Sequence, residues 1–111
     1  MSVPGTEQAR VVLVTAPDLA SARSLARGLV ERRLAACVNL VPGLESVYRW
    51  QGAVESSNEV LLLVKTAAAR LPALESFLES EHPYDVPECI ALQPERVERA
   101  YLDWLLAESQ P

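Results

Sequence analysis

The fold is decided by residues 10–30, which read RVVLVTAPDLASARSLARGLV. The Val- and Leu-rich run from Arg10 to Thr15 ends at Ala16-Pro17 and predicts a buried strand. Asp18 follows as the predicted N-cap of a helix. Beyond it, apolar residues recur at helical spacing and predict a helix with one buried face (Leu19, Ala22, Leu25, Ala26, Leu29 and Val30).

Residues 35–65 predict two long strands joined by a tight turn. We expect the first strand to run from Ala35 to Trp50, with a turn or bulge at Pro42-Gly43, and the second from Val54 to Lys65. The connection Gln51-Gly52-Ala53 suits a hairpin, because glycine tolerates the positive φ that such turns need. Two arms of this length should project beyond a compact core.

Three large side chains lie near the tip of this hairpin, where their own domain offers little cover. A partner subunit is the simplest cover for exposed aromatic rings. We therefore assign Tyr48, Arg49 and Trp50 to an oligomer interface. Stacking on a ligand is the less favoured alternative for the same segment.

The remaining segments predict two helices and one strand. Pro72 is tolerated only in the first turn of a helix, so the second helix should begin near Arg70 and end at His82-Pro83. A short strand is expected from Glu88 to Leu92. A third helix should bury one apolar face (Val97, Tyr101, Trp104 and Leu105).

The predicted order is β-α-β-β-α-β with an extra C-terminal helix, in a single domain over residues 1–111 with flexible ends at about 1–8 and 108–111. A split β-α-β arrangement gives a four-stranded antiparallel sheet with both helices on one face, an α+β sandwich of the ferredoxin-like kind. One sheet face and two edge strands are left without cover, which favours self-association.

Charge and hydropathy exclude several classes of partner. Fifteen acidic and ten basic residues give a net charge of −5, whereas a phosphate backbone needs clustered Lys and Arg, so no nucleic acid partner is expected. No apolar run reaches the ~20 residues that cross a bilayer, so no membrane partner is expected. Residues 1–7 lack the features of a secretion signal, and we expect a cytoplasmic protein.

The densest polar cluster is HPYDVPE at residues 82–88, which holds the only histidine. A neutral imidazole beside the carboxylate of Glu88 suits Cu, Zn or Ni, and a nearby thiolate from Cys89 would favour copper. The alternative is that His82 caps the end of the second helix while the prolines set the turn. No nucleophile motif accompanies either cysteine, so we expect no enzymatic activity.

Seven blocks of the sequence fit one family pattern in order and spacing. They are residues 14–17 (VTAP), 34–39 (LAACVN), 41–43 (VPG), 46–52 (SVYRWQG), 64–66 (VKT), 82–84 with 87–88 (HPY and PE), and 101–104 (YLDW). Across about residues 10–107 the chain resembles the divalent-cation tolerance protein CutA family. The resemblance implies a tightly packed homotrimer, similar in shape to the PII nitrogen-signalling proteins, and an association with tolerance of copper and other divalent cations.

The resemblance also bears on the metal ligands. Cys37 lies in a matching block, so it joins His82 and Glu88 as a candidate metal ligand. Some relatives carry a cysteine where this chain has Val14, so one thiolate that a soft-metal site could use is missing here.

A trimer would form clefts between protomers, and motif matches and polarity select Lys65, Glu59 and Tyr84 as residues that line one. The expected function is that of a cytoplasmic, non-enzymatic homotrimer that responds to metal ions and binds copper or another divalent cation, with no cofactor required. The alternative is a PII-like signalling or docking trimer that binds a small metabolite or a protein at this cleft.

Overall fold

The computed structural model describes residues 3–111. Its elements are η1 (Thr6–Gln8), β1 (Ala9–Ala16), α1 (Leu19–Glu31), β2 (Cys37–Trp50), β3 (Ala53–Ala67), η2 (Ala68–Arg70), α2 (Leu71–Glu81), β4 (Ile90–Leu92) and α3 (Arg99–Glu108). The four strands form one antiparallel sheet in the order β2-β3-β1-β4. The predicted α+β class and the predicted element order are confirmed.

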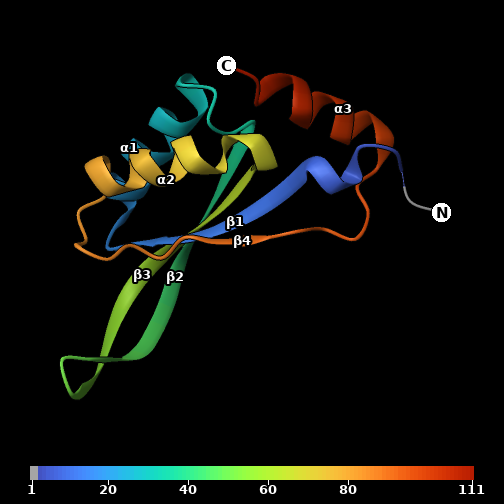
Figure 1. The fold of residues 1–111 in the computed structure, drawn as a ribbon. Coiled ribbons are helices and arrows are strands. Elements are labelled where there is room, and N and C mark those ends of the chain that lie inside the picture. The colour runs from blue at the N-terminus through green and yellow to red at the C-terminus, as the bar shows by residue number, and fades with distance from the viewer. Residues whose placement is uncertain (1–2) are drawn as a thin grey trace.

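Helices α1 and α2 lie side by side on one face of the sheet, and most of the opposite face carries no helix (Figure 1). The alternation of side chains along β1 explains this arrangement, because Val12 and Val14 are fully buried on the helix side. On the other side, Leu13 pairs with Ile90 and Val11 with Leu92. Ile90 and Leu92 are 49% and 48% exposed, so this apolar face has no cover within one chain.

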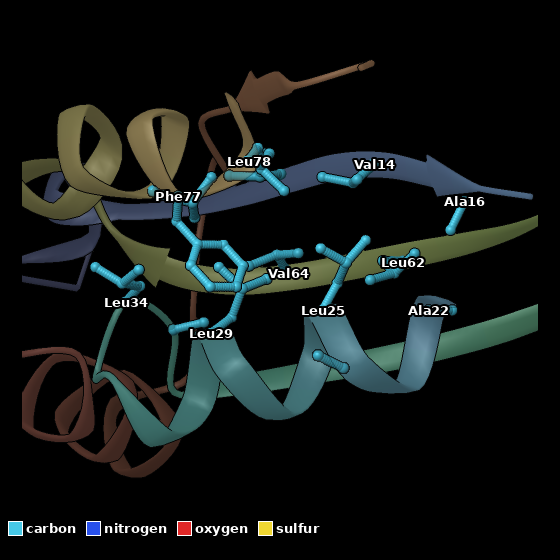
Figure 2. Close-up of a cluster of buried hydrophobic side chains, with 14 of the residues drawn as sticks. Val14, Ala16, Ala22, Leu25, Leu29, Leu34, Leu62, Val64, Phe77 and Leu78 are labelled. Carbon is cyan, nitrogen blue, oxygen red and sulfur yellow. The ribbon is translucent and has the colours of Figure 1, made fainter. Parts of the chain in front are cut away.

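The main core lies between the two helices and the sheet. Leu25 and Leu29 of α1 point toward Phe77 of α2 and toward Leu62 and Val64 of β3 (Figure 2). The predicted buried face of α1 is confirmed at Ala22, Leu25, Ala26 and Leu29, while Leu19 is partly buried against the same core.

Helix α1 differs from the prediction at one end and matches it at the other. Val30 is 42% exposed rather than buried, because it lies at the edge of the buried helix face, beside Arg27 on an open surface groove. The helix begins as predicted, since the Asp18 side chain accepts a hydrogen bond of 2.7 Å from the backbone N–H of Ser21.

The β2–β3 hairpin extends away from the helices and lengthens the molecule to 45 Å (Figure 1). The pairing of its strands shifts register between Val41 and Leu44, which confirms a bulge at Pro42-Gly43. Trp50 pairs with Ala53 across a two-residue turn in which Gln51 and Gly52 both have positive φ, 51° and 82°. A turn of this kind matches the twist of the strands, so it fixes which side chains face each other along the hairpin.

The segments after the hairpin are close to the prediction. Helix α2 has proline in its first turn and ends at His82, as expected. Strand β4 covers Ile90–Leu92 and is shorter than the predicted strand. None of its three residues is buried, because β4 is an edge strand of the sheet with an uncovered face.

The predicted buried face of α3 is confirmed at Leu105 and, in part, at Val97, which packs against the same core, and it is wrong at the two aromatic residues. Its buried residues are Leu102 and Leu105, whereas Tyr101 and Trp104 are 41% and 43% exposed and their rings contact each other. The helix packs at the end of the sheet where β1 begins (Figure 1). There Leu102 joins a small second core with Val3, and it takes the buried position that was predicted for Tyr101.

The two ends of the chain were expected to be flexible. Residues 1 and 2 lie outside the described residues. Within the described part, Val3 and Thr6 are buried at the N-terminal end and Ser109 at the C-terminal end. No helix between residues 3 and 111 is long and apolar enough to cross a membrane.

Candidate functional site

A groove of about 590 Å³ lies where the end of β1, the hairpin and the turn after α2 meet. Its lining consists of Thr15 from β1, of Tyr48, Trp50, Glu55, Ser57 and Glu59 from the hairpin, and of Pro83, Tyr84, Asp85, Val86 and Glu88 from the turn. The volume falls in the range of small-molecule sites. This groove is the candidate functional site.

The turn after α2 is held in place by His82, which is 7% exposed. The Nε2 atom lies 2.8 Å from the carbonyl oxygen of Thr15, and Nδ1 accepts a hydrogen bond of 3.0 Å from the backbone N–H of Tyr84. A carbonyl only accepts and an amide N–H only donates, so the ring is neutral with its proton on Nε2. Both nitrogens are therefore engaged within the chain, and neither is directed to a ligand.

Tyr84 connects this turn to the hairpin. Its hydroxyl donates a hydrogen bond of 2.8 Å to Oε2 of Glu59, a carboxylate that is 9% exposed. Burial, and then the hydrogen bond to Glu59, raise the pKa of Tyr84 well above its usual value of 10.0. The phenol therefore stays protonated and orients the Glu59 carboxylate at the floor of the groove.

Glu88 is the second carboxylate near this point. Burial, and then repulsion from the charge of Glu59, raise the pKa of Glu88 above its usual value of 4.5. A carboxylate whose charged form is disfavoured in this way is a place where a bound cation would lower the free energy.

The opposite wall of the groove comes from the hairpin. Tyr48 pairs with Glu55 across the strands, and its hydroxyl lies 3.2 Å from Oγ of Ser57. Trp50 lies on the same strand face as Tyr48, because side chains alternate along β2. Arg49 lies on the other face, so the structure divides the predicted interface residues between two faces of the hairpin. Their role in an interface stays a prediction.

The charged side chains that line the groove are all acidic. Four carboxylates line it, on Glu55, Glu59, Asp85 and Glu88, and among its described lining residues there is no lysine, arginine or histidine. A cation is the ligand charge that such a groove favours. Between residues 3 and 111, however, no three His, Cys, Asp or Glu side chains are grouped so that they could hold a metal ion.

The predicted site residues fall in two places. Glu59, Tyr84 and Glu88 line the groove. Cys37 and Lys65 lie at the opposite end of the sheet, where they pair in register, and the Lys65 ammonium lies 4.0 Å from Sγ of Cys37 and donates to Asn39.

The two places are well separated. Thr15, which anchors His82, pairs with Leu61, four positions along β3 from Lys65. Four positions along a strand span about 13 Å. A single chain therefore does not bring Cys37 together with His82 and Glu88.

Several groove residues were missed at the level of sequence. Glu55, Ser57 and Asp85 were not selected, and Tyr48 and Trp50 were assigned to an interface. A two-residue turn at Gln51-Gly52 places Tyr48 opposite Glu55, so this wall of the groove could have been predicted from the sequence. No local pattern indicates that the turn after α2 reaches the hairpin.

Comparison with known proteins agrees with this fold. The divalent-cation tolerance protein CutA of Thermus thermophilus is 55% identical over 95 residues, which are 86% of this chain and 92% of that protein. A solved structure of the T. thermophilus divalent cation tolerance protein has a TM-score of 0.90 at 51% identity and covers 92% of this chain and 99% of that chain. CutA1 of Oryza sativa has a TM-score of 0.90 at 43% identity, covering 93% of this chain and 94% of that chain.

Longer relatives also match. Human Protein CutA is 47% identical over 103 residues, 93% of this chain, and the chain covers 56% of the human protein. The sequence model described as CutA1 divalent ion tolerance protein matches residues 10–108. With a family match over nearly its whole length and relatives at this identity, the chain belongs to the CutA1 divalent ion tolerance family.

Proposed function

We propose that this chain takes part in divalent-cation tolerance as a non-enzymatic, cytoplasmic homotrimer that binds the ion, copper first among the candidates, in its acidic groove. The names of the family and of the T. thermophilus relative, which both refer to divalent-cation tolerance, support this direction. The observation that carries the proposal is the charge of the groove, which four carboxylates line without a basic neighbour among the described lining residues.

The proposed ligands are the carboxylates of Glu59 and Glu88. Both line the groove, and Tyr84 holds Glu59 in position. His82 could act as a ligand only after giving up its bond to Thr15 or to Tyr84. Copper prefers imidazole and thiolate, so a site built from carboxylates and water should bind it with modest affinity.

The uncovered surfaces of the chain support a homotrimer. Ile90 and Leu92 lie on the free sheet face, and Val47 and Val54 are 68% and 66% exposed on the hairpin. Exposed apolar area of this extent marks protein contacts. In the trimer we expect the sheet faces to turn inward, the edge strands to pair, and the hairpin to reach a neighbour through the face that carries Arg49.

The alternative is a PII-like trimer that binds a small metabolite or docks a protein at a cleft between protomers. The volume of the groove, about 590 Å³, favours an organic ligand over a lone ion. The two functions can be distinguished by testing which ligand, a metal ion or an organic molecule, shows saturable binding.

The test is a titration of the reduced, metal-free protein with Cu(II) and Zn(II), with the assembly mass measured by light scattering. The Glu59→Gln and Glu88→Gln variants are compared with Glu79→Gln, which removes an exposed charge on α2. We expect saturable copper binding near a micromolar Kd, about −8 kcal/mol, in the wild type and in Glu79→Gln.

We expect each groove variant to weaken copper binding at least about tenfold. Equal copper affinity in all three variants would show that the groove carboxylates do not bind the ion. A stable monomer at micromolar concentration would contradict the homotrimer.

A further inference from the structure

The same groove holds three aromatic side chains that binding of a metal ion would not use. Tyr48 and Trp50 line one wall, and Tyr84 lines the other. A divalent ion needs only a few oxygen ligands, so it accounts neither for the rings nor for a volume of about 590 Å³. The rings therefore point to a second kind of ligand, whether or not a metal ion binds.

The two tyrosine rings are held by their polar ends. The hydroxyl of Tyr84 donates to Glu59, and the hydroxyl of Tyr48 lies within hydrogen-bond distance of Ser57. These contacts use the phenol oxygens within the protein, so a ligand would meet the two rings mainly as apolar surfaces with negative faces. Trp50, 43% exposed, adds the ring type that binds cations best.

The carboxylates select the charge of the ligand. Glu55 lies next to Tyr48 in the cross-strand pair, Glu59 lies further along the same face of β3, and Glu88 comes from the turn after α2. With no basic side chain among the described lining residues, nothing there would hold a phosphate or a carboxylate. An anionic metabolite is therefore disfavoured.

Aromatic rings combined with carboxylates are the surroundings that bind quaternary and alkyl-substituted ammonium ions. We propose that the groove binds a small alkylammonium cation, with its alkyl groups against Trp50 and Tyr48 and its charge facing Glu55 and Glu59. The ligand class thus combines a permanent or protonated positive nitrogen with an apolar surface that packs against the rings.

The experiment uses the assembled protein and tetramethylammonium chloride as the probe, with tert-butanol as a neutral molecule of similar shape. Ionic strength is held constant with NaCl, since surface charges attract any cation. A Trp104→Phe background leaves Trp50 as the only tryptophan, so its fluorescence reports on the groove. We expect a saturable change with tetramethylammonium and none with tert-butanol.

Calorimetry then tests the rings directly. We expect Trp50→Leu to weaken tetramethylammonium binding about tenfold, Trp50→Tyr to weaken it only slightly, and Trp104→Leu to leave it unchanged. Trp104 is a matched control because it is 43% exposed, like Trp50, but lies on α3. Circular dichroism and assembly mass must match the wild type in each variant.

Three outcomes would overturn the proposal. They are equal binding of tert-butanol, equal affinity in Trp50→Leu and the wild type, and no saturable binding because a neighbouring copy covers the rings. Loss of copper binding in the Glu59→Gln variant would not bear on the alkylammonium proposal. In turn, Trp50→Leu should leave copper binding intact. The two proposals therefore fail separately.

Discussion

The imidazole of His82 lies 2.8 Å, at Nε2, from the carbonyl oxygen of Thr15, a residue 67 positions earlier in the chain. This bond ties the turn after α2 to the last residues of β1, and the Nδ1 bond to the Tyr84 N–H fixes the direction in which the turn leaves α2. Tyr84 then reaches Glu59. His82 therefore shapes the groove without lining it.

Replacing His82 with alanine should reduce stability more than copper affinity. The change leaves the Thr15 carbonyl and the Tyr84 N–H without partners, which should lower the free energy of unfolding by about 2–4 kcal/mol. His82→Asn should lower the free energy of unfolding by less, because its amide oxygen can still accept a hydrogen bond from the Tyr84 N–H. Urea denaturation at fixed protein concentration measures both.

Copper titration of the folded His82→Ala variant completes this test. We expect the affinity to change less than about threefold, because the proposed ligands are Glu59 and Glu88. A tenfold or larger loss in a variant that keeps its assembly mass would identify His82 as a metal ligand after all.

Glu88 should make stability depend on pH. Because its pKa is raised, the native state keeps this proton over a range above pH 4.5 in which the unfolded chain has released it. Stability therefore falls as the pH rises through that range. Glu88→Gln should raise the free energy of unfolding at pH 7 by less than about 1 kcal/mol, since water still reaches the groove, and should have no such effect at pH 4. A gain of equal size at both pH values would contradict this cause.

Thr66 offers a test of a buried hydrogen bond far from the groove. Its hydroxyl donates 2.7 Å to the carbonyl oxygen of Leu34, and the residue is fully buried. Thr66→Val keeps the volume but leaves that carbonyl unsatisfied, so we expect a loss of about 1–3 kcal/mol in chemical denaturation. Thr66→Ser keeps the donor and should lose only about 1 kcal/mol for the missing methyl group. A smaller loss in Thr66→Val than in Thr66→Ser would mean that packing of the methyl group contributes more than the hydrogen bond.

Much of the fold follows from local patterns. The apolar face of α1, the proline in the first turn of α2 and the glycine turn of the hairpin each predict an element that the structure contains. In α3 the pattern was ambiguous, because Tyr101 and Leu102 both have helical spacing to Leu105, which was correctly predicted to be buried. Only contact with the second core decides between them.

The candidate site was predictable only in part. Glu59, Tyr84 and Glu88 could be chosen from polarity and from the family resemblance, and they do meet in the groove. The sequence alone could not show that Cys37 lies far from these three residues, because its distance from them depends on the strand register over the whole length of β3. The contribution of Trp50 to the groove likewise depends on how the hairpin is placed against the turn after α2.

Helices α1 and α2 approach each other closely at Gly28. A Cβ atom added at Gly28 of α1 would lie 2.8 Å from Cζ of Phe77 on α2, nearer than side-chain contacts allow. Alanine favours the helix by about 1 kcal/mol over glycine. Displacing a ring that is packed in the core costs about 1–3 kcal/mol, so Gly28→Ala should destabilise the protein on balance.

A double variant isolates this contact. Phe77→Leu shortens the side chain and makes room for the new methyl group, so Gly28→Ala should be neutral or stabilising in that background. The difference between the two backgrounds, measured by urea denaturation, is the free energy of the clash itself. If Gly28→Ala stabilises the wild-type background by the full helix-propensity gain, then α1 and α2 have room to move apart, and glycine is not required for their packing.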